Sequence, residues 1–381
     1  MSGKHAKLSP SSSAKWINCP PSLQLEALYP DKTSEYAAEG TLAHKAAELA
    51  VKSHYTLLSQ RSYSARLSAI KRDKAYQDEM LDYADVMLDT VKAIDRQYNS
   101  ASIVATEQSV SYDAYAEGGC GTADCILING SDLWVVDYKY GKGVPVDAHE
   151  NSQLMLYGLG ALELYGQIFD IKDVHMVIVQ PRLNNTSQYD RTKEQLVAWG
   201  ETVVKPAAEL ALKGEGALKV GPHCRFCKAK ARCRAQAETN LELAKMEFKK
   251  AELLSDQEIG EVISKAEDLV SWANAVKDYA LRALLDGKDI PGWKAVEGRS
   301  VRVFADTDAA FKKVIAAGYD EALLYERKPI TLTAVEKLMG KKQFTEVLSE
   351  DVVKPQGKPT LAPESDKRAP YGLSQAQKDF N

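Results

Sequence analysis

The sequence predicts an α/β protein in which helices flank a central sheet. Three observations support this fold class. Apolar residues recur at helical spacing through much of the first hundred positions. From residue 102 the pattern changes to β-branched and aromatic segments separated by glycine and asparagine. A very apolar strand at residues 174–181 lies between two helical segments, an order typical of a buried sheet covered by helices.

The first third of the chain is predicted to be helical. Residues 36–53 are rich in alanine and leucine at helical spacing, and residues 74–98 carry an apolar stripe, so each segment predicts one helix. The Ser/Arg-rich segment between them, residues 59–72, is expected to be a loop or a frayed helix.

A meander of three strands is predicted next. The expected strands are residues 103–112, 121–130 and 133–141. Helices are expected on either side of the apolar strand, at residues 149–165 and 191–213.

The C-terminal part begins with an irregular segment. Residues 214–236 contain glycine, proline, histidine and three cysteines without periodicity, which predicts a ligand-binding loop. The elements expected beyond it are helices at 237–254 and 256–286, a hairpin within 292–304, and small helices near 306–317 and 331–348. A Pro- and Lys-rich tail from Lys354 is predicted to be disordered. The expected regions are therefore a domain at 1–236, a helical and small α+β region at 237–353, and a tail at 354–381.

The composition limits the classes of protein to consider. The chain has 381 residues, of which 45% are hydrophobic and 27% charged. Its net charge of −4 excludes a uniformly basic surface, although local basic clusters can still contact phosphate. No apolar run approaches the roughly 18 to 20 residues of a membrane span, and the N-terminal residues lack the apolar core of a signal peptide. These features predict a soluble, cytoplasmic protein.

Two carboxylates and a lysine form the most informative local pattern. Asp137 and Lys139 are two positions apart on one predicted strand, so they project from the same face of the sheet. Asp124 lies on the preceding strand, and a hairpin can bring it beside Asp137. Two adjacent carboxylates repel unless a hard cation such as Mg²⁺ or Mn²⁺ neutralises them. The lysine can then orient a water nucleophile and stabilise the negative charge of a phosphoryl transition state.

An ordinary surface ion pair between Asp137 and Lys139 is the alternative for this pattern alone. Residues on the first helix favour a site. Gly40, His44 and Glu48 recur at intervals of four, which places His44 and Glu48 on one face and allows close approach at Gly40. Histidine is a good additional metal ligand, although a single helical histidine is more often structural.

A second polar pair, Gln153 and Tyr157, shares one face of the helix after the third strand, although such pairs are common. In order, these motifs resemble the RecB-type branch of the PD-(D/E)xK nucleases over roughly residues 10–236. The matching series is GxxxHxxxE at 40–48, Glu107, GxxD at 121–124, DxK at 137–139 and QLxxY at 153–157. The complete series is far more specific than any one member.

The resemblance implies a PD-(D/E)xK nuclease core, with a mixed central sheet flanked by helices, in residues 1–236. The metal ligands that it implies are His44, Asp124, Asp137 and the backbone carbonyl of Tyr138. The catalytic group that it implies comprises Asp124, Asp137, Lys139 as the catalytic lysine, and Gln153 and Tyr157 as residues that support the site or contact DNA. Glu107 occupies a matching position, but a strand glutamate is also an ordinary solvent-facing residue.

The cysteines suggest a second metal site. Six cysteines are too sparse for a disulfide scaffold, and three of them, Cys224, Cys227 and Cys233, lie close together. Both zinc and iron–sulfur clusters require four ligands. Candidates for the fourth are Cys19, Cys120, Cys125 and His223. Cys19 is favoured because it lies in an irregular Cys-Pro-Pro turn, whereas the other two cysteines belong to a strand and are expected to be buried thiols.

A distant cysteine combined with a late CxxCx5C motif is similar to the pattern of AddB-type and CRISPR-adaptation nucleases of the same branch. That resemblance implies a 4Fe-4S cluster on Cys19, Cys224, Cys227 and Cys233, which joins the two ends of the domain. Zinc is the alternative, since a Cys₃His set with His223 is chemically reasonable. The basic residues around the motif are expected to contact DNA phosphates, or else to form a solvated face: Lys219, Arg225, Lys228, Lys230, Arg232 and Arg234.

Two functions from different classes follow. The first is a Mg²⁺- or Mn²⁺-dependent DNA exonuclease, and the second is a non-catalytic iron–sulfur or zinc DNA-binding protein on the same fold. The nuclease is favoured because a binding module gains nothing from crowding two carboxylates near DNA phosphate. The whole chain also resembles an uncharacterised phage and prophage protein family. This resemblance implies a role in phage DNA recombination, replication or repair in a bacterial host, with a phage single-strand-binding or annealing protein as a partner.

Overall fold

The computed structural model describes residues 6–30, 35–244, 256–296, 306–316, 320–324, 335, 340–348 and 351–352. The chain divides into two compact units, residues 1–296 and 297–381. The domain boundary predicted at residue 236 lies within the first unit. The tail predicted from Lys354, most of the predicted hairpin and most of the helix predicted near 331–348 lie outside the described residues.

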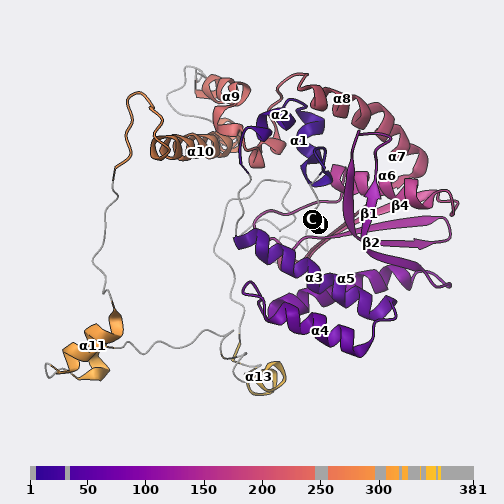
Figure 1. Ribbon diagram of the computed structural model, residues 1–381, viewed down its shortest axis with the longest axis horizontal. Coiled ribbons are helices and arrows are strands. Elements are labelled where there is room, and N and C mark those ends of the chain that lie inside the picture. Colours follow the sequence, from indigo (N-terminus) through magenta and orange to yellow (C-terminus); the bar gives the residue numbers. More distant parts are fainter. Residues whose placement is uncertain are drawn as a thin grey trace. The chain divides into compact units, whose positions relative to one another are not determined.

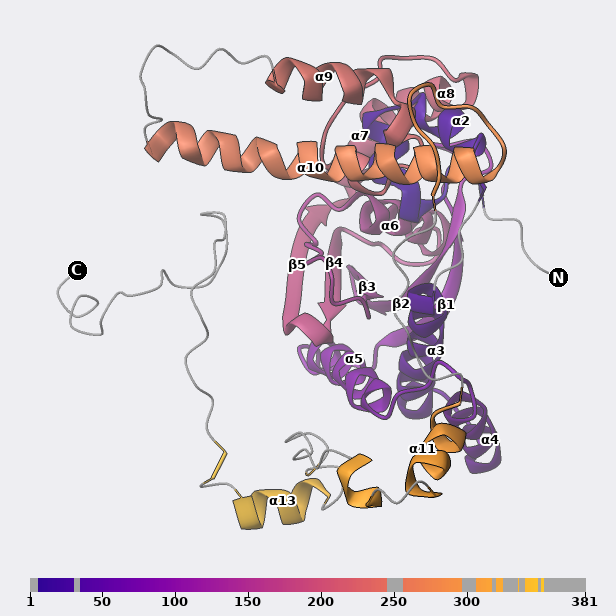
Figure 2. The ribbon, with the colours of Figure 1, turned by 90° about the vertical axis from the view of Figure 1, so that its left-hand side faces the viewer.

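Five strands form one mixed sheet in the order β1-β2-β3-β4-β5 (Figure 2). Their bounds are β1 Ile103–Ser111, β2 Cys120–Asn129, β3 Asp132–Tyr138, β4 Asp173–Gln180 and β5 Asn185–Thr192. β3 and β4 run parallel, and the other neighbouring strands run antiparallel. Helix α6 (Ser152–Tyr165) joins the parallel pair, because parallel strands require a crossover connection. The predicted α/β class with a mixed, helix-flanked sheet is confirmed.

Helices cover both faces of this sheet (Figure 1). The helices of one face are α3 (Glu35–Tyr55), α4 (Gln60–Lys71) and α5 (Glu79–Asp95). Those of the other side are α1 (Ser13–Asn18), α2 (Ser22–Ala27), α6, α7 (Lys193–Trp199) and α8 (Lys205–Lys213). Side chains of β3 alternate between the two layers, since Leu133 and Val135 join the core under α6 while Trp134 and Val136 join the core under α3 and α5.

Several elements differ from the prediction. Residues 60–71 form a regular helix, α4, because the Ser59 side chain caps it by accepting a hydrogen bond from the Ser62 amide. β5 is an additional strand whose polar sequence, NTSQYDRT, lacks the apolar alternation that reveals a strand. The helix expected at 191–213 begins at Lys193 and contains a π-helical segment, Gly200–Val204, between α7 and α8.

The cysteine-rich segment folds into two short 3₁₀ turns, η4 (Pro222–Phe226) and η5 (Lys230–Arg232), and is followed by α9 (Arg234–Ala244). The long helix α10 (Asp256–Leu285) contacts both η5 and α9. The helices described in the second unit include α11 (Thr307–Ala316) and α13 (Lys341–Leu348). Within the described residues, no helix has the length and apolar character needed to cross a membrane.

Candidate functional site

Three carboxylates lie in one row across the sheet. The flanking β1–β2 pairs, Thr106–Cys125 and Gln108–Ala123, place Glu107 level with Asp124 at a break in the ladder. The β2–β3 ladder ends at the pair Cys125–Val136, and continuing its register by one position places Asp124 opposite Asp137. Like charges directly opposite each other destabilise a sheet. The register thus places Asp124 beside Asp137, as expected from the hairpin, and extends the acidic row to Glu107.

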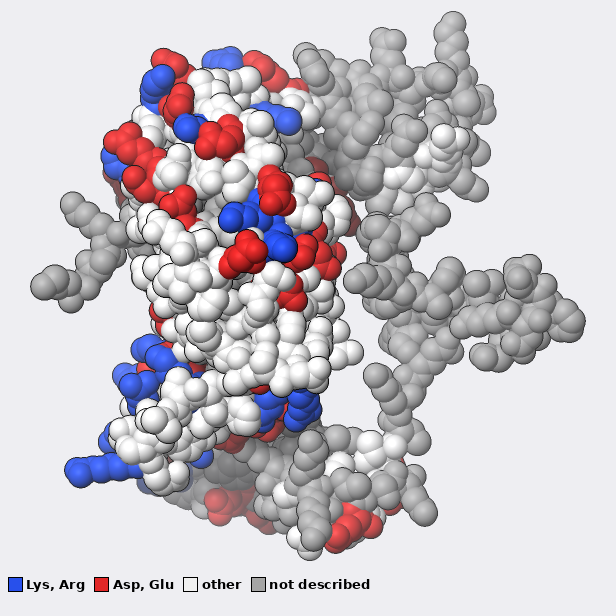
Figure 3. Space-filling view, turned by 90° about the vertical axis from the view of Figure 1, so that its right-hand side faces the viewer, with Lys and Arg blue, Asp and Glu red and all other residues white. Residues whose placement is uncertain are grey.

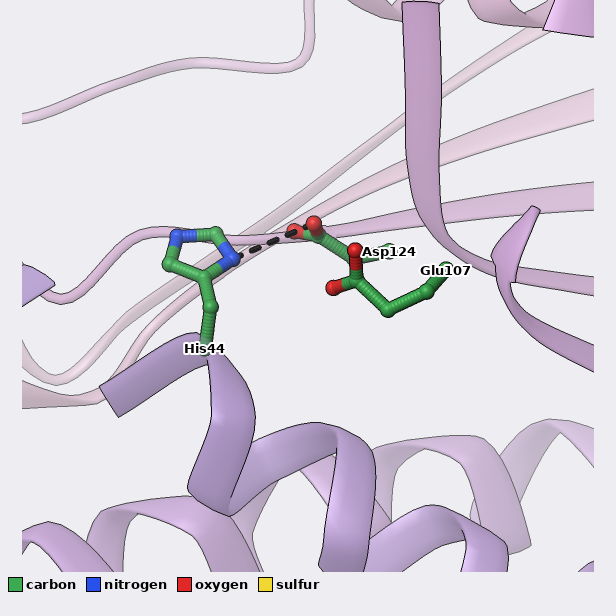
Figure 4. A group of neighbouring side chains, drawn as sticks. All are labelled: His44, Glu107 and Asp124. Atoms are coloured by element: carbon green, nitrogen blue, oxygen red, sulfur yellow. Dashed lines mark hydrogen bonds and ion pairs between the residues drawn. The ribbon is translucent and has the colours of Figure 1, made fainter. Parts of the chain in front are cut away.

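His44 reaches this row from α3 (Figure 4). Its Nδ1 atom lies 3.1 Å from Asp124 Oδ1. Ligand atoms of His44, Glu107 and Asp124 all lie within 4.8 Å of one another. The His44 ring meets the buried Tyr138 ring edge-on at 5.5 Å between centroids, which restricts its orientation. One imidazole nitrogen and two carboxylates form a donor set that fits Mn²⁺ or Mg²⁺.

The second oxygen of Asp124 is oriented by the backbone. Asp124 Oδ2 accepts a hydrogen bond from the Tyr138 amide at 2.7 Å. The metal prediction named the Tyr138 carbonyl, whereas the contact that the structure describes uses its amide. Asp137, also a predicted ligand, lies outside the group of three, whereas Glu107 lies inside it.

Glu107 has an unusual backbone conformation for a strand residue. Its φ angle is 50°, in the left-handed region that non-glycine residues rarely adopt. Partial removal from water, followed by the nearby carboxylates of Asp124 and Glu48, raises the pKa of Glu107. Such strain costs roughly 1–3 kcal/mol and clusters at functional sites. Glu107 is exposed, as expected of a solvent-facing residue, and its strained backbone is the observation that favours a further role.

The buried ion pair of Asp137 and Lys139 forms the other half of the site. Asp137 is 2% exposed, and its Oδ2 atom lies 2.8 Å from Lys139 Nζ. Burial raises the pKa of Asp137, and the Lys139 charge opposes this shift. Burial would lower the pKa of Lys139, but the Asp137 carboxylate reverses that effect and the net shift is upward. The Asp137 carboxylate thus stabilises the charged form of Lys139.

Helix α6 supplies the residues that hold this ion pair. Lys139 Nζ donates to Gln153 Oε1 at 3.0 Å, and Gln153 Nε2 donates to Asp137 Oδ1 at 3.3 Å. Gln153 Nε2 also lies 3.2 Å from the Tyr157 hydroxyl. The structure therefore brings the predicted catalytic residues of β3 and α6 into one network. Asp137 Oδ2 has the Lys139 ammonium at 2.8 Å as its partner, so each oxygen of this buried carboxylate faces a group of the network.

The glycines of the two sequence motifs behave differently. A Cβ atom on Gly121 would lie 2.6 Å from Pro10 and 3.0 Å from Tyr157, so the GxxD glycine allows α6 to pack closely beside the site. At Gly40, no described atom lies within 4 Å of such a Cβ, and the close approach expected there is not observed. Glu48 forms an ion pair with Lys52.

The cysteines expected to bind metal line one cavity. Cys19, Cys224, Cys227, Cys233 and His223 all contribute to its wall. In a tetrahedral zinc site, Zn–S bonds of about 2.3 Å place the sulfurs about 3.8 Å apart. Among the described residues, no three potential ligands of this cavity lie within 4.8 Å of one another. In a 4Fe-4S cluster each thiolate binds a separate iron, so wider spacing is compatible with a cluster. Cys125 is fully buried in the core, as expected, but Cys120 is exposed.

A family model described as "Protein of unknown function (DUF2800)" matches residues 5–369. The chain belongs to the DUF2800 family. Among solved structures, the DUF2800 chain is similar to one titled "Crystal structure of SSO0001", with 16% identity over 59% of this chain and 96% of that chain. The TM-score of that match is 0.24, which is too low to assign a shared fold.

The six basic residues predicted to bind DNA occupy different surroundings in this DUF2800 chain. Lys228, Lys230 and Arg232 line a groove between the cysteine-rich segment and α10. Lys219 instead lines the cysteine cavity, and its carbonyl oxygen lies 2.8 Å from His223 Nε2. Arg225 lies over the Phe226 ring, and Arg234 lies 4.0 Å from Glu238 on the exposed face of α9.

Proposed function

We propose that this DUF2800 protein is a Mg²⁺- or Mn²⁺-dependent DNA exonuclease with a PD-(D/E)xK core. The observation that carries the proposal is the acidic row of Glu107, Asp124 and Asp137, with His44 beside Asp124 and the charged Lys139 beside Asp137. A purely structural role for this row is a poor explanation, because the chain carries backbone strain at Glu107 and a buried carboxylate at Asp137.

The residues divide the chemistry between them. His44, Glu107 and Asp124 would hold the cation, and Asp137 would lie beside it in the row, paired with Lys139. When bound, the cation would neutralise phosphate oxygens and lower the pKa of a water molecule. Lys139 remains protonated and stabilises the negative charge that builds on the phosphoryl group. Gln153 fixes the orientation of both Lys139 and Asp137.

Cleavage of end-labelled duplex and single-stranded DNA, with added Mg²⁺ or Mn²⁺, tests the proposal. The wild-type protein should release short products from DNA ends and leave covalently closed circles intact. Asp124→Asn should remove this activity, whereas Asp170→Asn, a change at an 89% exposed aspartate, should not. DNA binding by the metal-loaded wild-type protein without any cleavage would favour the non-catalytic DNA-binding alternative.

The cysteine cavity supports a second part of the proposal, a 4Fe-4S cluster on Cys19, Cys224, Cys227 and Cys233. All four thiols line one cavity although Cys19 is distant in sequence from the other three. The cluster would join the N-terminal helices to the segment after α8, which is a structural role. A function in phage DNA recombination, replication or repair is consistent with this activity and remains part of the proposal.

A further inference from the structure

The groove between the cysteine-rich segment and α10 has a volume of about 940 Å³. We infer that it binds single-stranded DNA. This inference rests on the proposed nuclease function and assigns it a strand preference. Three segments form the walls of the groove, namely residues 28–30 after α2, residues 226–232, and the C-terminal half of α10 with the following turn.

The charge of the groove suits a phosphate backbone. Its basic residues are Lys228, Lys230, Arg232, Arg282 and Lys288, whereas its acidic residues are Asp278 and Asp286. Among the residues that the structure describes, Arg282 and Lys288 form no ion pair, and both are exposed. Acidic and basic side chains are interspersed on the face shown in Figure 3, so a basic excess is not a general property of the surface.

Aromatic side chains in the groove distinguish single strands from duplexes. Phe226 is 70% exposed, and Arg225 lies over its ring at 5.8 Å from the centroid. Tyr29 and Tyr279 line the same groove. Aromatic rings stack on unpaired bases, and this contact is not available to the stacked bases inside a duplex. Basic and aromatic residues together in one groove are therefore typical of a single-strand-binding surface.

Contacts between its segments hold basic residues of the groove in place. Lys230 Nζ donates to the Arg225 carbonyl at 3.2 Å and to Ser271 Oγ on α10 at 3.4 Å. Arg232 lies over the Tyr279 ring, 5.5 Å from its centroid. Cys227 lines both this groove and the cysteine cavity. The metal bound by the cysteines would therefore hold one wall of the groove in place.

The test is fluorescence anisotropy of the full chain with a labelled oligothymidine and with a duplex of equal length, without added divalent metal. We expect tighter binding to the single strand. Phe226→Leu keeps an apolar side chain but cannot stack, so affinity for the single strand should fall between about 5-fold and 150-fold. Phe226→Tyr should retain wild-type affinity. Iron content, measured for both variants, confirms that the adjacent cysteine site is intact.

The salt dependence separates phosphate contacts from stacking. Replacing Arg232 and Arg282 by alanine together should reduce the slope of log affinity against log salt by about 1.4, since each single-strand phosphate contact contributes about 0.7. Lys172→Ala, at a 67% exposed lysine outside the groove, should leave the slope unchanged. An unchanged slope in the double variant would overturn the assignment of these arginines.

Failure of this inference and failure of the proposed function give different results. Equal or tighter binding to the duplex, or wild-type affinity in Phe226→Leu, overturns the single-strand groove even if the protein cleaves DNA. Single-strand binding that depends on Phe226, in a protein that never cleaves DNA with Mg²⁺ or Mn²⁺, supports the groove and overturns the nuclease.

Discussion

Lys139, the residue after β3, is joined to Gln153 on α6 by a hydrogen bond with 3.0 Å between Nζ and Oε1. The same glutamine donates through Nε2 to Asp137. One side chain from α6 therefore orients both members of the buried ion pair. Helix α6 therefore contributes a residue to the candidate site and also packs against the sheet.

Gln153→Ala should lower the rate of DNA cleavage by about 10-fold to 100-fold, as is typical when a residue that orients a metal site is removed. The reason is that Lys139 and Asp137 lose their common partner. The measurement is kcat at saturating Mn²⁺. Gln188→Ala, at an exposed position on β5, is the matched control. A wild-type kcat for Gln153→Ala would show that the ion pair orients itself without α6.

Lys139→Ala should destabilise the metal-free protein at neutral pH by about 3 kcal/mol, because it leaves the Asp137 carboxylate buried without a counter-charge. Adding Asp137→Asn removes that carboxylate, so the double variant should regain more than half of the loss. Urea unfolding followed by circular dichroism measures both effects. If the double variant is no more stable than Lys139→Ala, the loss comes from packing and not from charge.

Manganese affinity should depend on pH through His44. Burial lowers the pKa of His44, but the Asp124 carboxylate raises it, and the net shift is above the ordinary value of 6.5. Metal binding requires the neutral imidazole. Because the pKa of His44 is raised, Mn²⁺ affinity should begin to fall on acidification before the pH reaches about 6.5. In the metal-free protein, stability should change with pH in the opposite direction. Protonated His44 pairs with Asp124 and stabilises the fold at low pH, and this contribution is lost as the pH rises through the raised pKa.

Calorimetric titration of Mn²⁺ between about pH 6 and pH 8 measures the first effect. His44→Asn should bind Mn²⁺ more weakly at the upper end of this range, with a flatter dependence on pH. Equal pH dependence in the wild-type protein and His44→Asn would assign His44 a structural role.

The strain at Glu107 predicts opposite effects on stability and activity. Glu107→Gly accepts the φ angle of 50° without strain, whereas Glu107→Gln retains the strain and removes only the charge. Both variants should lose Mn²⁺ affinity and cleavage. In the metal-free state, thermal unfolding should show the glycine variant more stable than the glutamine variant by about 1 kcal/mol. Full activity in both would remove Glu107 from the metal ligands.

The cysteine cavity predicts a metal content that can be measured directly. Protein purified without oxygen should contain about four irons and four sulfides per chain, as expected for a Cys₄ cluster. Cys19→Ser should lower this content and the stability of the protein, because the N-terminal helices are no longer tied to the later segment. Cys120→Ser, at an exposed cysteine outside the cavity, should do neither. One zinc per chain in place of iron would identify zinc as the bound metal.

The sequence predicts the central strands of the fold well, because β2 and β3 combine β-branched residues with clear turn signals. It does not reveal β5, since a partly exposed strand of polar residues has no apolar alternation. The short helices α1 and α2 are also not predicted, because six residues are too few to show a helical period.

For the site, the spacing of Asp137 and Lys139 is enough to place both on one strand face, and the structure pairs them. The acidic row cannot be predicted from such spacing alone. The relative positions of Glu107 and Asp124 depend on the register between strands, which local patterns do not determine. Periodicity likewise cannot find the groove on α10, whose walls come from segments far apart in the chain.

The wide separation of Cys19 from Cys233 has a consequence for the synthesis of the protein. The two residues line one cavity but lie more than 200 positions apart. At about 5–20 residues per second, the ribosome needs roughly 10–40 s to reach Cys233 after adding Cys19. Until Cys224 is added, the Cys19 thiol is present in a nascent chain that lacks the other three, and it is open to oxidants and to other metal ions. With the proposed cluster, the yield of complete protein should therefore depend on the redox state and the iron supply of the producing cell.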